Sequence, residues 1–119
     1  MEFKYKSVKS LEERKAEYEK VQNSNPGKIG IICEKAPKSK IPDIEKSKFL
    51  IAENLNIAQF TTIIRKKLNL DEKEALFFLA NGKTALSGNE TLLEIYKKYK
   101  DEDGFLYIAY AAEEVWGNK

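Results

Sequence analysis

The chain has 119 residues, of which 42% are hydrophobic and 34% charged, a composition typical of one globular domain. It contains no histidine, no glycine-rich phosphate-binding loop and a single cysteine, Cys33, which argues against an enzyme, a metal site, a bound cofactor and a disulfide framework. The net charge of +2 includes only two arginines among 21 basic residues, so we expect no nucleic-acid partner and favour an acidic peptide as the partner of the lysines around residues 35–48.

The first clear element is a helix that begins after Ser10. Ser10 and Glu13 have the spacing of a capping box, and helix-forming residues continue to about Gln22. Apolar residues are sparse along this segment, so we expect it to lie on a surface and to contribute one narrow apolar stripe. The Asn-Pro-Gly sequence at 25–27 should end it, and a shorter helical piece is predicted at about 3–8.

Two strands are predicted next, on either side of a loop at 36–47 that contains two prolines. The first strand, 29–33, should be buried, and the second, 48–52, has apolar side chains on both faces, which is unusual near a surface. A helix capped by Asn56 should follow, with Ile63 on its flank. The predicted buried face of this helix consists of Ile57, Phe60, Thr61, Ile64 and Leu68.

The last third of the chain predicts two more strands and a helix. A strand is expected at 75–80, and the Asn-Gly pair that follows should turn the chain into a short edge strand at 83–86. The remaining elements are a helix at about 92–100 capped by Asn89 or Thr91, a turn at 101–104 and a strand at 105–110. This order indicates an α+β fold in which a β-grasp sheet packs against the middle helix, with the leading helix on the outer face.

Five short motifs occur in a fixed order along most of the chain. They are Glu12-x-Arg14-Lys15-Ala16-Glu17, Ile32-Cys33-Glu34-Lys35-Ala36, Ile41-Pro42-x-Ile44-x-Lys46-x-Lys48, Gln59-Phe60-x-x-x-Ile64-Arg65 and KDEDGFLY at 100–107. Together they resemble the autophagy ubiquitin-like modifiers, the family of autophagy-related protein eight, the GABARAP proteins and the microtubule-associated light-chain-three proteins. The resemblance extends from about residue 3 to Gly117, and motifs of this length in this order are highly specific.

The resemblance implies a ubiquitin-like β-grasp preceded by two additional N-terminal helices. Residues 1–24 would form the helical extension, residues 25–112 the β-grasp core and residues 113–119 a flexible tail processed after Gly117. Family members are trimmed by a cysteine protease to a C-terminal glycine, carried by E1-like and E2-like enzymes, and conjugated to phosphatidylethanolamine. The resemblance therefore implies a cytoplasmic protein that moves to autophagosomal membranes when it is lipidated. Trp116 stands before the matching glycine, where phenylalanine is common in the family.

The resemblance also implies a groove for receptors and adaptors with aromatic-x-x-aliphatic motifs, which add a strand to the edge of residues 48–52. The pocket for the aromatic residue maps onto Glu17, Val21, Lys48, Leu50 and Phe105. The pocket for the aliphatic residue maps onto Phe49, Ile51, Leu55, Phe60 and Ile63. Lys46 and Lys48 would contact the acidic residues that often precede the motif.

Two positions depart from the family pattern, and other interpretations stay open. Gly30 and Ala52 stand where proline is common, so Gly30 should remove apolar wall from the aromatic pocket and Ala52 should restore a backbone N–H at the sheet edge. Leu50, Phe60 and Phe105 are also compatible with an ordinary core, and a lone glycine such as Gly117 occurs often by chance. The alternative function is an unconjugated β-grasp module for protein–protein interaction.

Overall fold

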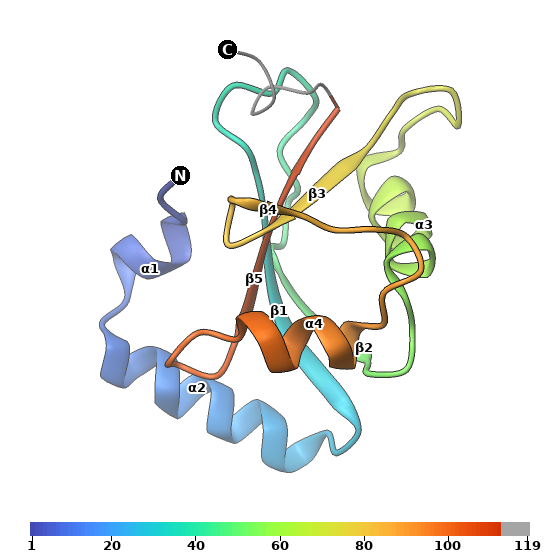
Figure 1. Cartoon of the computed structure of the whole chain (residues 1–119). Helices are drawn as coiled ribbons and strands as arrows, with labels where there is room; N and C mark the ends of the chain where they lie inside the picture. Colours follow the sequence, from blue (N-terminus) through green and yellow to red (C-terminus); the bar gives the residue numbers. More distant parts are fainter. Residues whose placement is uncertain (113–119) are drawn as a thin grey trace.

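The computed structural model describes residues 1–112, which form four helices and five strands (Figure 1). The helices are α1 (Lys4–Val8), α2 (Leu11–Ser24), α3 (Ile57–Leu68) and α4 (Leu92–Tyr99). The strands are β1 (Lys28–Lys35), β2 (Lys48–Ala52), β3 (Phe77–Ala80), β4 (Thr84–Ala85) and β5 (Leu106–Ala111). The predicted order of elements is confirmed, including the short helix that precedes α2.

The five strands form one mixed sheet in the order β2-β1-β5-β3-β4. β1 and β5 run parallel, and the other neighbouring strands are antiparallel. α3 lies on one side of the sheet, whereas α1 and α2 lie on the other (Figure 1). Within residues 1–112, β2 and β4 are the edge strands, so each has one side without a paired strand.

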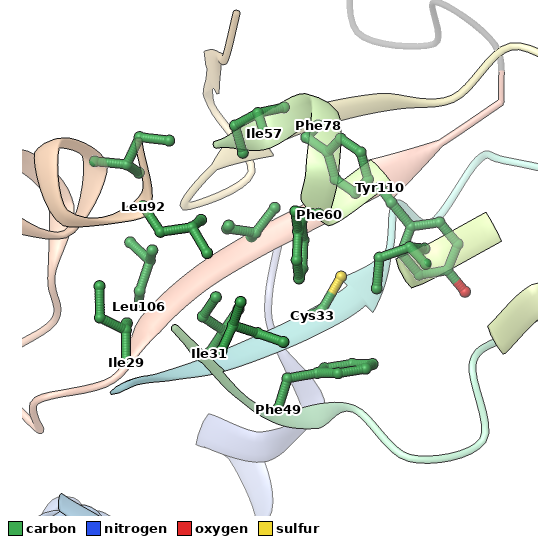
Figure 2. Packing of buried hydrophobic residues seen from close by; sticks show 14 of the residues in the cluster. Ile29, Ile31, Cys33, Phe49, Ile57, Phe60, Phe78, Leu92, Leu106 and Tyr110 are labelled. Atoms are coloured by element: carbon green, nitrogen blue, oxygen red, sulfur yellow. The ribbon is translucent and has the colours of Figure 1, made fainter. Parts of the chain in front are cut away.

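Neighbouring residues of the central strands belong to two separate apolar clusters, because successive side chains of a strand point to opposite faces. Ile31 and Cys33 pack in the larger cluster with α3 and α4, whereas Ile32 packs in the smaller cluster with residues of α1. Figure 2 shows the larger cluster, in which the Cys33 sulfur lies among aliphatic and aromatic side chains. The sheet is therefore covered on both faces, with the main core on the α3 side.

Local sequence signals explain where the helices begin. The predicted capping boxes of α2 and α3 are both present, with reciprocal hydrogen bonds between Ser10 and Glu13 and between Asn56 and Gln59. Thr91 caps α4, and it forms a capping box of its own with Glu94, a pairing that Asn89 is too distant to make. The buried residues of α3 are Ile57, Phe60, Ile64 and Leu68, while Thr61 of the predicted face is half-buried.

The strands near the β4 edge are shorter than predicted. β3 begins at Phe77, which pairs with Ala111, the last residue of β5, and residues 75 and 76 pair with no strand of the described residues. β4 has only two residues instead of the expected four. The predicted turn between β3 and β4 is present, with three residues between the paired Ala80 and Thr84 and positive φ angles of 56° at Asn81 and 72° at Gly82, a region that asparagine and glycine tolerate best.

Candidate functional site

The candidate groove lies along β2, which within the described residues pairs with β1 alone. Phe49 and Ile51 are buried in the cluster on the α3 side, so the alternating Lys48 and Leu50 lie on the α2 side. Leu50 is 36% exposed, which makes it one of three large exposed hydrophobic residues in the described chain. An extended peptide added to this edge would therefore meet apolar side chains on both of its faces.

The predicted aromatic pocket combines residues of α2, β2 and the chain just before β5. Glu17 and Val21 are four residues apart on α2, and the Lys48 ammonium forms an ion pair with the Glu17 carboxylate. This hydrogen bond lowers the pKa of Glu17 below its ordinary value, so the carboxylate is charged at neutral pH. The ion pair bridges α2 and β2 at the rim of the predicted pocket, and its two side chains are 30% and 37% exposed.

Phe105, the fifth residue of the predicted aromatic pocket, is completely buried, so none of its surface is open to a ligand in the free protein. Its ring makes edge contacts with Tyr5 and Tyr18, at 5.6 Å and 5.2 Å between ring centres. A Cβ atom added at Gly30 would lie 2.9 Å from the Phe105 ring. The ring thus occupies the space that Gly30 leaves, and it offsets the loss of apolar wall that we expected at this position.

The predicted aliphatic pocket lies on the α3 side of β2. The rings of Phe49 and Phe60 are in edge contact, with centres 6.2 Å apart, and both belong to the main core together with Ile51. Leu55 and Ile63 are half-buried against the same cluster. The structure therefore brings all five predicted residues together, and Leu55 and Ile63 are the two with side chains partly open to a ligand.

A cavity of about 410 Å³ lies at the beginning of β2. Lys46 and Lys48, which we expected to meet acidic residues, both line it. Glu45 and Lys67 of α3 also line it. Lys67 was not predicted as a site residue, because a lysine in the last turn of a helix is already explained by the helix dipole. Three ammonium groups and one carboxylate give this end of the groove a positive balance that favours an acidic ligand.

Polar contacts hold α2 in place, since none of its side chains is buried. Arg14 donates a hydrogen bond to the Asp103 carboxylate at 2.8 Å, and Asp103 also accepts hydrogen bonds from the Tyr107 hydroxyl and from a backbone N–H. This network fixes the helix that carries Glu17 and Val21. Sequence reasoning missed it because Asp103 reads as an ordinary turn residue.

The described residues bear on three other kinds of function: cysteine chemistry, metal binding and membrane insertion. Cys33 is completely buried, and burial raises the pKa of its thiol, so it is protonated and shielded from reagents. Residues 1–112 contain no group of three or more histidine, cysteine, aspartate or glutamate side chains arranged to hold a metal ion. None of the helices in this range has the length and apolar content of a membrane span. Gly117, the predicted processing site, lies outside the described residues.

Comparison with known proteins places this arrangement in a family. A family model described as autophagy protein Atg8, ubiquitin-like, matches residues 13–117. The crystal structure of Trypanosoma brucei ATG8 superimposes with a TM-score of 0.91 at 39% sequence identity, over 95% of this chain and 97% of that chain. This similarity confirms the predicted ubiquitin-like fold with two N-terminal helices. Because the family match spans most of the sequence and the structural match nearly all of it, the chain belongs to the Atg8 family of ubiquitin-like autophagy proteins.

Proposed function

We propose that this protein is a ubiquitin-like modifier of autophagy, trimmed after Gly117 and conjugated to phosphatidylethanolamine on autophagosomal membranes. Membership of the Atg8 family supports the proposal, and the family match extends to Gly117 itself. A glycine carboxylate has no Cβ, so it can pass through a narrow enzyme channel and serve as an acyl donor. The partners of this step are a processing cysteine protease, an E1-like enzyme and an E2-like enzyme, with the protein itself acting as the modifier rather than as a catalyst.

The second part of the proposed function is recruitment of receptors and adaptors with aromatic-x-x-aliphatic motifs. The observation that carries it is the edge of β2 that no strand of residues 1–112 pairs with, with Leu50 exposed on one face and Ile63 half-buried on the other. A peptide strand at this edge gains backbone hydrogen bonds that are independent of its sequence. Two of its side chains three residues apart point to opposite faces, which fits one pocket on the α2 side and one on the α3 side.

Acidic residues before the motif would meet Lys46, Lys48 and Lys67 at the cavity that begins β2. These lysines are exposed, so their effect should fall mainly on the association rate and on its dependence on salt. The apolar pockets should instead determine how slowly the peptide dissociates, because buried apolar anchors carry most of the binding free energy in such interfaces.

Titration of an acidic-flanked peptide against wild-type protein and two groove variants tests this assignment. Lys48→Glu should weaken binding through the association rate, and Ile63→Ala should weaken it by about 1–2 kcal/mol through faster dissociation. Lys83→Glu reverses an exposed charge beside the opposite edge strand, and Leu86→Ala truncates a half-buried residue there, so both serve as matched controls. Unchanged affinity in both groove variants, with intact unfolding midpoints, would show that the adaptor surface lies elsewhere.

The alternative function, an unconjugated interaction module with the same groove, differs only at the tail. Intact mass spectrometry of the cellular protein separates the two, since conjugation requires loss of Asn118-Lys119 and addition of a lipid at Gly117. Gly117→Ala should block both changes without affecting the unfolding midpoint. A lipid adduct on the alanine variant would show that Gly117 is not the acyl donor.

A further inference from the structure

Tyr5 carries a buried polar group that the fold leaves without a partner. Its side chain is only 9% exposed, in the smaller cluster with Phe105 and Tyr107, and its hydroxyl makes no hydrogen bond to any group in residues 1–112. It is the one buried side-chain nitrogen or oxygen of which this is true in that range. Native proteins pair such groups almost always, because leaving one unpaired costs free energy.

The Tyr5 ring lies beside two residues of the predicted aromatic pocket, Lys48 and Phe105. The Lys48 ammonium that binds Glu17 is 5.9 Å from the centre of the Tyr5 ring, and the Tyr5 and Phe105 rings make an edge contact with their centres 5.6 Å apart. Burial, followed by the negative charges of Glu17 and Asp103, raises the pKa of Tyr5 to about 12. The hydroxyl therefore keeps its proton at neutral pH and remains a hydrogen-bond donor.

Of the two carboxylates that act on Tyr5, only Glu17 has capacity to change partners. Asp103 is buried and already accepts hydrogen bonds from Arg14, Tyr107 and a backbone N–H. Glu17 has one side-chain partner in the structure, Lys48, and their ion pair is partly exposed. Exposed ion pairs contribute little net stability, so this one is easily exchanged for another.

We propose that Tyr5 is a positioning residue of the peptide groove. When Lys48 leaves Glu17 to pair with an acidic residue of the bound peptide, the Tyr5 hydroxyl donates a hydrogen bond to the Glu17 carboxylate. This inference rests on the proposed function, in which Lys48 contacts the acidic flank. In the free protein Glu17 binds Lys48, and the Tyr5 hydroxyl has no hydrogen-bond partner among residues 1–112. In the complex Lys48 pairs with the peptide, and Glu17 accepts a hydrogen bond from Tyr5. The complex thus gains the Tyr5–Glu17 hydrogen bond that the free protein lacks, and peptides with an acidic flank bind more tightly as a result.

Tyr5→Phe removes the hydroxyl and keeps the ring, so it separates this role from packing. We expect the affinity for an acidic-flanked peptide to fall about three- to tenfold, while the unfolding midpoint stays the same or rises, since an unpaired buried group has been removed. With the acidic residues of the peptide replaced by neutral ones, wild type and Tyr5→Phe should bind equally. Tyr110→Phe is the matched control, because its hydroxyl is paired with the Pro42 carbonyl, and it should lose stability without a loss that depends on the acidic flank.

A second measurement needs no peptide. Lys48→Ala releases Glu17, so Tyr5→Phe should lower the unfolding midpoint in the Lys48→Ala background although it does not in the wild type. Replacing Glu17 as well, by Glu17→Ala, should abolish that loss. Equal effects of Tyr5→Phe in both backgrounds, or equal loss of affinity for acidic and neutral peptides, would overturn the role of Tyr5. If the wild type binds neither peptide, the proposed groove is wrong. The unfolding midpoints in the Lys48→Ala background would still decide whether Tyr5 and Glu17 form a hydrogen bond.

Discussion

The two faces of the sheet are covered in different ways. On the α3 side, four residues of α3 and two of α4 are buried in a continuous apolar cluster. On the opposite side, α2 has no buried residue and is attached through side-chain hydrogen bonds and the half-buried Tyr18, while Phe3 and Tyr5 of the N-terminal segment supply most of the apolar contacts. Apolar burial is the dominant favourable term in folding, so the α3 side should carry most of the stability.

The difference also suits the proposed division of roles. A densely packed face has little room to rearrange, because protein interiors are close-packed. A helix held by exchangeable polar contacts, such as that between the Tyr18 and Tyr96 hydroxyls at 2.7 Å, can adjust with small cost. The residues of the proposed aromatic pocket include Glu17 and Val21 of this helix, whereas those of the proposed aliphatic pocket belong to the main core or pack against it. We therefore expect ligand-dependent change on the α2 side of the groove.

Ile31 and Ile32 test the comparison most directly, since they are adjacent, completely buried and on opposite faces of β1. We expect Ile31→Ala to lower the free energy of unfolding by about 4 kcal/mol, toward the upper part of the usual range. Ile32→Ala should cost about 2–3 kcal/mol, because the loosely held α1 and α2 can settle into the cavity. Denaturant titration of both variants measures the difference, and equal losses would mean that the two faces are equally rigid.

Features that depend on local pattern were predictable from the sequence. The capping residues Ser10 and Asn56 act on backbone groups two or three residues away, and the apolar period of α3 is read within one helix. The apolar side chains on both faces of the strand at 48–52 were also predictable, because they follow from alternation within one short segment. Strand ends were less predictable, since Phe77 begins β3 where it pairs with Ala111 of β5, a distant segment.

Features that depend on distant pairing were not predictable. Arg14 and Asp103 are 89 residues apart, and nothing in either local sequence indicates that they meet. The same holds for Lys67, which reaches the cavity beside Lys46 from a different element. The unpaired hydroxyl of Tyr5 is a further case, because an unsatisfied group is defined by everything that surrounds it. Such residues can be identified only from the tertiary structure. The family resemblance predicts only the groove positions that are already known for the family.

Asp103→Ala should have the next largest effect, at the attachment of α2. It removes the nearer carboxylate partner of Arg14, which keeps an ion pair with Asp101 at 3.5 Å, and it also removes the partner of the Tyr107 hydroxyl. We expect a loss of about 3 kcal/mol in the free energy of unfolding, at the low end for a broken buried ion pair because Arg14 is partly exposed to water. Asp103→Asn keeps an acceptor for the tyrosine and should lose less. Thermal or denaturant unfolding of the two variants measures which one loses more free energy of unfolding.

Hydrogen exchange shows which elements lose stability in Asp103→Ala. If polar contacts hold α2, amides of residues 11–24 should exchange faster than those of β1 and β5 in the wild type, and faster still in Asp103→Ala. The amides of α3 should change little. Protection of α2 equal to that of the central strands would contradict the difference between the two faces.

The smallest expected effects are at the helix caps, where Ser10 and Thr91 form the same capping box on opposite faces of the sheet. Thr91→Ala should lower the free energy of unfolding by about 1 kcal/mol, because α4 is part of the main core and cannot fray alone. Ser10→Ala should mainly fray the start of α2 and change global unfolding less.

Hydrogen bonds from the capping residues lower the pKa of Glu13 and of Glu94. Each carboxylate therefore stabilises its helix above its ordinary pKa, and this contribution is lost as the pH falls through the lowered value. Nuclear magnetic resonance titration of the two glutamates should show both pKa values rising toward the ordinary value in the respective alanine variants. Only Thr91→Ala should also reduce the acid dependence of global unfolding, and the same reduction in Ser10→Ala would mean that α2 unfolds with the core after all.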